Sequence, residues 1–147
     1  MENYQHILIA ADFSDHSQQV ISRAQELSER YQAKLSICHI IEDFPIADFA
    51  YEPMISIDLD MRDAMLDSGK KHIADIARKF DIPTENQWVE FGSPSHNVVR
   101  LAQDNNVDLI VVGSHGRHGI KLLLGSTANG ILHHALCDVL AIRLTRE

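Results

Sequence analysis

Five consecutive apolar residues, Ile7-Leu8-Ile9-Ala10-Ala11, lie near the start of this chain of 147 residues. Their side chains do not alternate between apolar and polar, and such a run is typical of a strand that is covered on both faces. Two further stretches share this character, Leu35–Ile41 and Leu109–Val112. The three stretches therefore predict buried strands of a parallel sheet.

The segment between the first two runs predicts a helix. From Ser14 to Tyr31, apolar residues recur at helical spacing, as Val20, Ala24 and Leu27 show. A strand, a helix and a strand joined by short loops form a βαβ unit, whose crossover is right-handed and whose strands run parallel.

The rest of the chain continues this alternation of strands and helices. Residues 42–57, with two prolines and four acidic residues, are expected to form a long surface loop. Further helices are predicted at about 58–80, from Pro94 onward and at about 126–136, and further strands at 87–91, 108–113 and 139–144. This order predicts one α/β domain over residues 1–147, an open doubly wound parallel sheet of five strands in the order 3-2-1-4-5 with helices on both faces. The alternating strand at 87–91 is expected at the sheet edge.

The place of a ligand follows from this topology. Where successive connections leave a parallel sheet in opposite directions, the two flanking loops part and open a crevice. In the order 3-2-1-4-5 that crevice lies between strands one and four. The loops that face it carry Asp12 and the segment from Gly113 to Ser126.

Composition and charge narrow the possible functions. The chain is 45% hydrophobic and 23% charged, as in compact globular domains. Its formal net charge of -8 repels nucleic-acid backbones and anionic lipids, so we expect neither nucleic acid nor membrane as a partner. No signal-like segment opens the sequence, and Cys38 and Cys137 have no partner at motif spacing. These features predict a cytoplasmic protein with buried thiols.

The stretch from Gly113 to Thr127, GSHGRHGIKLLLGST, is the most informative about a ligand. Glycines at the carboxyl end of a strand let backbone amides approach an anion. Gly125-Ser126-Thr127 places amides and two hydroxyls at a helix start, where the helix dipole favours phosphate. The other interpretation is a plain turn in which Ser126 caps the helix. By spacing alone the plain turn is favoured, because short glycine patterns are common.

Two charged side chains have a similar choice of roles. Asp12 closes the first predicted strand at the crevice, where its carboxylate accepts hydrogen bonds from an adenine amine or a ribose hydroxyl, or caps the helix that follows. Arg117 is placed to neutralise phosphate, although basic side chains in surface loops are most often simply solvated.

Four motifs are spread along the chain, at Ile7–Ser14, Ile37–Ile40, Asp108–Gly116 and Cys137–Arg143. Together they resemble the universal stress protein family over nearly the whole length. The resemblance implies the five-stranded fold, a homodimer formed through the last strand and, in one branch, ATP held between the first and fourth strands. In that branch the implied site residues are Ala11, Asp12, Ile40, Gly113, Gly116, Gly125 and Ser126.

The glycine loop departs from the family pattern at one point. The ATP-binding branch usually has nine residues between the second and third of these loop glycines, whereas Gly116 and Gly125 enclose eight. Eight residues resemble the UspA-type branch, whose best-known members lack the glycines and hold no ATP. The chain therefore combines the loop length of one branch with the glycines of the other. The one-residue deletion either shifts the phosphate-binding amides or is absorbed by Gly119, because glycine tolerates positive φ.

Neither a metal site nor a catalytic site is expected. His115 and His118 are too few for zinc, and His133 and His134 point in different directions on a helix. His39, in a buried strand, is expected to be a hydrogen-bonded core histidine. The sequence has no nucleophile elbow and no P-loop motif.

These observations predict a cytoplasmic stress-response homodimer, paired through residues 139–144, that acts through unknown protein partners rather than by turnover. It is expected to bind ATP or AMP, with or without Mg²⁺, between strands one and four. Thr127 and Arg117 join the implied site residues there. The alternative is a UspA-like interaction dimer without nucleotide. An enzyme that uses ATP to activate a substrate is disfavoured, because the chain has no Ser-Gly-Gly or His-x-Gly-His run.

Overall fold

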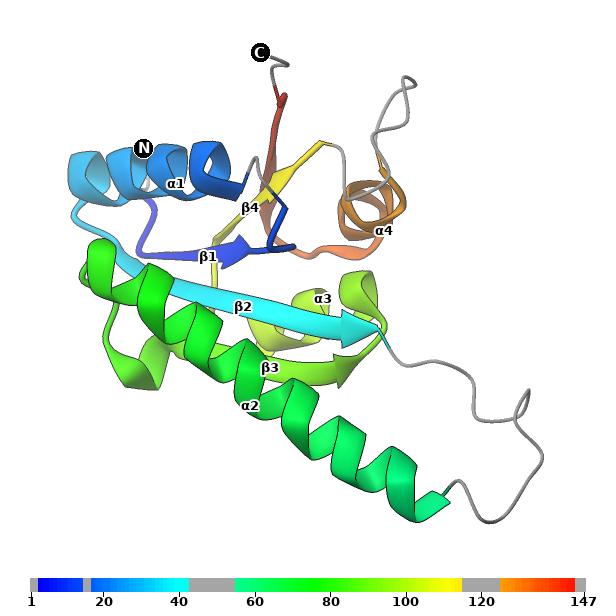
Figure 1. Ribbon diagram of the computed structural model, residues 1–147. Helices are drawn as coiled ribbons and strands as arrows, with labels where there is room; N and C mark the ends of the chain where they lie inside the picture. The colour runs from blue at the N-terminus through cyan, green and yellow to red at the C-terminus, as the bar shows by residue number, and fades with distance from the viewer. Residues whose placement is uncertain (1–2, 15–16, 43–54, 115–124, 145–147) are drawn as a thin grey trace.

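A computed structural model describes residues 3–14, 17–42, 55–114 and 125–144. Five parallel strands form one sheet in the order β3-β2-β1-β4-β5, as the sequence predicts. The strands are β1 (His6–Ala10), β2 (Lys34–Glu42), β3 (Gln87–Gly92), β4 (Leu109–Gly113) and β5 (Asp138–Ile142). Figure 1 shows β1 at the centre of the sheet, between β2 and β4.

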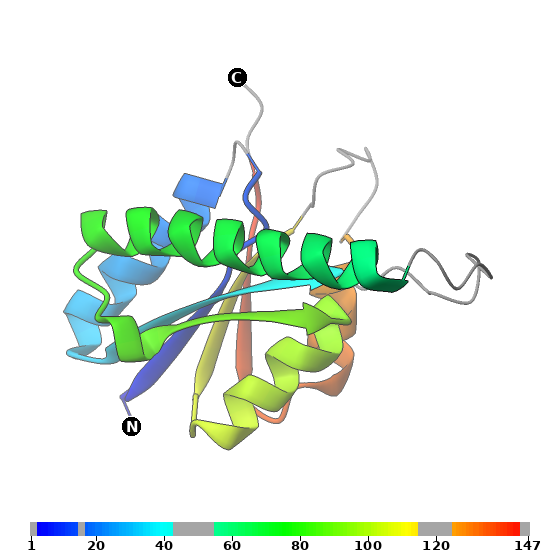
Figure 2. The ribbon, with the colours of Figure 1, turned by 60° about the horizontal axis from the view of Figure 1, so that its bottom comes forward.

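Within the described residues, four α-helices and one short 3-10 helix connect the strands. They are α1 (Ser17–Tyr31), α2 (Ile55–Lys79), η3 (Thr84–Asn86), α3 (Pro94–Asp104) and α4 (Ser126–His134). Helices α1 and α2 cover one face of the sheet, and α3 and α4 cover the other (Figures 1 and 2). The predicted doubly wound arrangement is therefore confirmed.

The apolar run at the start of the chain explains the two layers of core. Ile7 and Ile9 pack beneath α1 and α2, while Leu8, between them, packs against α3 and α4. All three side chains are fully buried. Because neighbouring residues of a strand point to opposite faces, a strand covered on both sides must be apolar throughout.

Some predicted boundaries shift by a few residues. Helix α2 begins at Ile55 rather than near 58, and β5 ends at Ile142 rather than 144. Helix α4 ends at His134, because Ala135 adopts extended backbone angles of -66° and 143°. Strand β3 lies at the sheet edge as predicted, but its six residues are all half-buried and show no alternation.

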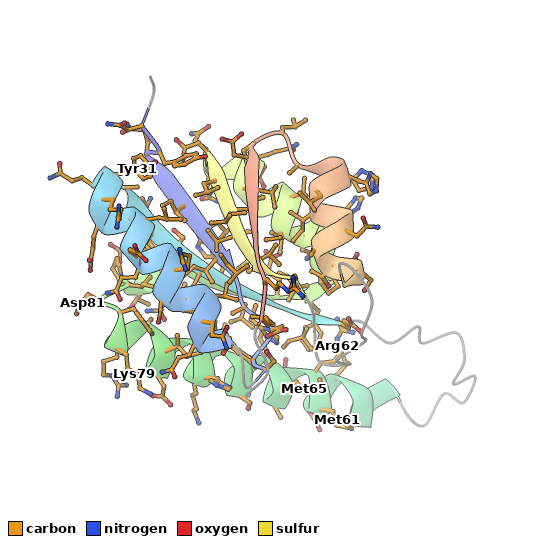
Figure 3. All side chains as sticks on the ribbon, turned by 90° about the horizontal axis from the view of Figure 1, so that it is seen from above. Tyr31, Met61, Arg62, Met65, Lys79 and Asp81 are labelled. Atoms are coloured by element: carbon orange, nitrogen blue, oxygen red, sulfur yellow. The ribbon has the colours of Figure 1, made fainter. Side chains whose placement is uncertain are left out.

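Helix α2 is only partly covered by the sheet. Ile73 is buried in the same core cluster as Ile7 and Ile9 of β1, and a Cβ on Gly69 would lie 3.0 Å from Cγ1 of Val89, so α2 approaches β3 closely at this glycine. Met65, earlier in the same helix, is 38% exposed. Figure 3 labels Met61 and Met65 toward the start of α2, which reaches past the end of β3 in Figure 2. The first turns of α2 therefore carry exposed apolar side chains, Leu59, Met61 and Met65.

No helix within the described ranges is long and apolar enough to cross a membrane.

Candidate functional site

The carboxyl ends of β1 and β4 meet at the point where the strand order reverses. Ala10 of β1 lies opposite Val112 of β4 in the parallel register, so the segments that follow the two strands leave the sheet side by side. Ala11 and Asp12 continue from one strand, and Gly113 and Ser114 from the other. The fold thus brings the predicted residues from both loops to one edge.

Asp12 makes a local hydrogen bond where β1 ends. Its Oδ1 accepts the backbone N–H of Ser14 at 2.9 Å, closing a turn around Phe13. Phe13 has a φ of 60°, in the left-handed region that a bulky side chain rarely adopts. Helix α1 begins only at Ser17, so the observed bond of Asp12 stabilises this turn and is not a helix cap.

Two histidines hold the same turn from other elements. Nδ1 of His39, on β2, lies 2.7 Å from the carbonyl oxygen of Ala11. The ring of Phe13 stacks on His39 at a centroid distance of 3.7 Å and on His72, of α2, at 4.0 Å. His39 is hydrogen-bonded, as predicted, through its bond to Ala11, but it is half-buried rather than a core residue. The role of His72 was not predicted.

The main chain of Ser114, directly after β4, is hydrogen-bonded to β5 and to the start of α4. Its N–H donates to the carbonyl oxygen of Ile142 at 2.8 Å, and its own carbonyl oxygen accepts the N–H of Gly125 at 2.5 Å. The second bond joins the two ends of the segment 115–124. Gly116 and Arg117 belong to that segment and lie outside the described residues.

Helix α4 begins at Ser126, as predicted, but its N-cap is Gly125, so the interpretation of Ser126 as the capping residue is wrong. The backbone angles of Gly125, -62° and 163°, are extended, and its carbonyl oxygen accepts the N–H of Asn129 at 3.0 Å. Ser126 is exposed and Thr127 half-buried in the first turn. The amides of a first helical turn have no acceptor within the helix, so they are available as donors for an anion.

Two hydroxyl groups at this edge are buried without a hydrogen-bond partner in the described part of the chain, Oγ of Ser14 and Oγ of Ser114. Ser114 is 7% exposed. A buried hydroxyl left unpaired costs about 1–3 kcal/mol, and folded proteins contain few of them. Neither serine was among the predicted site residues, although each follows one closely, at Asp12 and at Gly113.

Ile40 of β2 is buried, like Ala11, whereas the other described candidate residues are half-buried or exposed. It is 6% exposed and packs in the core beneath α3 and α4, next to Cys38. A ligand would therefore reach it only through its main chain or the small exposed part of its side chain. Burial raises the pKa of the Cys38 thiol to about 12, which keeps it protonated and unreactive.

Metal ligands do not converge in the described ranges, where no group of three His, Cys, Asp or Glu side chains is placed to hold an ion. His115 and His118 lie outside these ranges.

An open doubly wound sheet, with polar groups and a helix N-terminus at its reversal point, defines an α/β domain of the class in which the ligand position is the carboxyl edge of the sheet. A model described as "Universal stress protein family" matches residues 3–143. The chain belongs to the universal stress protein family.

Individual relatives agree with this assignment. The chain is 42% identical over 140 residues to "Universal stress protein A homolog 1" of Coxiella burnetii, covering 95% of this chain and 96% of the relative. Among solved structures, the universal stress protein UspA from Lactobacillus plantarum superposes with a TM-score of 0.82 at 23% identity, over 99% and 100% of the two chains. A universal stress protein in complex with cAMP superposes with a TM-score of 0.62 at 26% identity, over 96% and 98%.

Proposed function

We propose that this universal stress protein binds an adenine nucleotide, ATP or AMP, between β1 and β4. The observation that carries the proposal is the Ser114 hydroxyl, which is buried beside the start of α4 and has no partner among the described residues. A phosphate or ribose oxygen in the crevice would accept its hydrogen bond and remove the cost of leaving it unpaired.

The neighbouring groups have the chemistry that a nucleotide needs. The first turn of α4 offers amides and the hydroxyls of Ser126 and Thr127 to phosphates, with Mg²⁺ as an optional bridge. Asp12 retains acceptor capacity beyond its bond to Ser14, because a carboxylate has about four lone-pair positions. An adenine amine or a ribose hydroxyl fits that capacity. The solved family member in complex with cAMP supports an adenine nucleotide as the ligand class.

Calorimetry with ATP and with AMP, each with and without Mg²⁺, tests the proposal. Asp12→Ala is expected to weaken both nucleotides similarly, because Asp12 faces the nucleoside. Gly116→Val and Gly125→Val are expected to weaken ATP more than AMP, since a side chain then occupies the space beside the phosphates. Asp104→Ala removes the same charge from an exposed site on α3 and is the matched control. Equal losses for ATP and AMP in the glycine variants would contradict the assignment of the phosphates.

The alternative is a UspA-like interaction protein that holds no nucleotide. The 42% identical relative is named as a homolog of universal stress protein A, and the eight residues between Gly116 and Gly125 also favour this alternative. A wild-type protein that gives no heat of binding and no thermal shift with millimolar ATP and Mg²⁺ would select it.

We further propose that two copies pair through β5 and that the dimer acts on partner proteins in the cytoplasm. Strand β5 is at the sheet edge and pairs with β4 in the described structure, which leaves its other side as a template for a second chain. The unpaired thiols of Cys38 and Cys137 fit a reducing compartment.

A proline at position 141 tests this interface without breaking the sheet. The carbonyl oxygen of Ile142 accepts a bond from Ser114 of the β4 loop, so strand alternation turns the main-chain groups of Ala141 toward the free edge. Ala141→Pro is expected to shift sedimentation from dimer to monomer at micromolar concentration. Ala141→Val keeps the amide and is the control. A monomeric wild type would refute the interface.

A further inference from the structure

The turn at residues 11–14, which connects β1 to α1, is held by two histidine rings from other elements, His39 of β2 and His72 of α2. Phe13 contacts two imidazoles at interplanar angles of 26° with His39 and 15° with His72. Two parallel rings cannot stack on one face of a third ring, so the histidines lie on opposite faces of Phe13. The stack thereby connects β2, the turn and α2.

The backbone of this turn requires such support. A residue with a side chain in the left-handed region costs on the order of 1–3 kcal/mol and persists only where the surroundings enforce it. Phe13 is in that region, with a φ of 60°. The bond from the Ser14 N–H to Asp12 closes the turn, and the two imidazoles fix the ring that the turn displays.

His39 acts on this turn twice. Besides stacking on Phe13, its Nδ1 donates to the carbonyl oxygen of Ala11, which directly precedes Asp12. The same imidazole thus holds both neighbours of Asp12, the main chain of Ala11 and the side chain of Phe13. Because His39 is on β2, an inner strand paired on both sides, it is a rigid anchor.

We propose that His39 and His72 are positioning residues of the candidate nucleotide site: by clamping the Phe13 ring they keep the 11–14 turn in the conformation that presents Asp12, and they link α2 to the site. This inference rests on the proposed function in its reference to nucleotide. The clamp itself is a property of the ligand-free protein.

The exposure of His72 separates this role from ordinary core packing. His72 is exposed, whereas its neighbour Ile73 is 1% exposed and belongs to the core. Removing the His72 ring therefore deletes little buried surface, and the global free energy of unfolding is expected to change little. What it deletes is one of the two faces that hold Phe13.

His72→Ala, His72→Phe and the control His96→Ala test the clamp. His96 is an exposed histidine on α3, so its replacement makes the same chemical change away from the turn. The first readout is the solvent-exchange rate of the Ser14 amide, measured by NMR without ligand. A stacked aromatic pair contributes enough that its loss is expected to speed this exchange by about two- to tenfold in His72→Ala. His72→Phe, which keeps a ring there, is expected to restore the wild-type rate.

The second readout is AMP affinity by calorimetry. His72→Ala is expected to weaken AMP by a similar factor of about two to ten, with rescue in His72→Phe and an unchanged midpoint of urea unfolding. Unchanged exchange in His72→Ala, or a His72→Phe variant as impaired as His72→Ala, would overturn the clamp. A wild type that binds no AMP would overturn the proposed function instead, and the exchange rates decide the clamp in that case too.

Discussion

The amino and carboxyl ends of strands β1 and β4 differ in whether their buried polar groups have hydrogen-bond partners. At the amino end, the buried ring of His6 has both nitrogens engaged, Nδ1 with the carbonyl oxygen of Asn105 at 3.0 Å and Nε2 with Oγ of Ser36 at 2.7 Å. At the carboxyl end, the Ser14 and Ser114 hydroxyls are buried without partners in the part of the chain that the structure describes. Within the described residues, the polar groups named at one end are paired with each other, and the two hydroxyls at the other end are not.

The amino end is also reinforced through the main chain. The carboxylate of Asp108 accepts the N–H groups of Gln5 at 2.8 Å and His6 at 3.0 Å, and the N–H of Asp108 donates back to the His6 carbonyl oxygen at 3.0 Å. Strand β1 is thereby tied to β4 where the two strands start. The difference teaches that paired polar groups stabilise the amino edge of this sheet, and it supports the proposal of a ligand at the carboxyl edge.

His6→Ala is expected to have the largest effect on stability. It leaves the fully buried Ser36 hydroxyl and the Asn105 carbonyl without their partner and opens a cavity beside Trp88, so we expect a loss of about 3 kcal/mol. Urea unfolding followed by the fluorescence of Trp88 measures it. The exposed His96→Ala control should cost under about 0.5 kcal/mol. A loss below about 1 kcal/mol in His6→Ala would refute the importance given to this end.

Asp108→Ala is expected to cause the next largest loss in the free energy of unfolding. Removing a carboxylate that accepts two main-chain N–H groups should cost about 2 kcal/mol, and Asp108→Asn, which keeps one acceptor oxygen, about half of that. The same urea titration checks both. Equal losses in the two variants would show that the charge matters and the number of acceptors does not.

The pH dependence of stability is a smaller effect with a definite sign. Burial lowers the pKa of His6 below its usual 6.5, so between the folded and unfolded pKa values the unfolded chain binds a proton that the folded chain does not. This contribution to stability is complete above the unfolded pKa of about 6.5 and is lost as pH falls from there through the lower folded pKa. The free energy of unfolding, measured at pH 7.5, 6.5 and 5.5, should fall more steeply for the wild type than for His6→Gln. Parallel curves for the two proteins would contradict the attribution of this pH dependence to His6.

Matched serine substitutions compare the two ends most directly and include the smallest effect. Ser36→Ala should cost about 1–2 kcal/mol because His6 Nε2 loses its partner, whereas Ser114→Ala should leave the free energy of unfolding unchanged or raise it by up to about 1 kcal/mol. The two sites share residue type and burial, at 0% and 7% exposed. Similar losses at both positions would mean that the Ser114 hydroxyl has a structural role.

The strand order was predictable because it depends on a local pattern, and the polar ends were less so. The run Ile7–Ala11 predicts a central strand, yet the observed β1 begins at His6. A histidine does not read as a core residue. His6 is buried because Asn105 and Ser36, 99 and 30 positions away in sequence, satisfy its ring.

The candidate site divides along the same line. Gly113 and Gly125 could be placed from their motif, because glycine beside a strand end and at a helix start has a recognisable spacing. The stack of Phe13 on His72 and the burial of the Ser114 hydroxyl arise from contacts between distant segments. Asp12 had two predicted roles, and the bond to Ser14 adds a third that depends on where α1 begins.

The bond between Gly125 and Ser114 bears on how this family diversifies by insertion and deletion. It pins both ends of a ten-residue segment to one place, so α4 keeps its position whatever the segment's length. Adding one residue to such a closed segment changes its closure free energy by only about 0.1 kcal/mol. A lineage can therefore gain or lose a residue here at almost no thermodynamic cost, and the count of residues between Gly116 and Gly125 is a weaker guide to ligand class than the groups that stand at the junction.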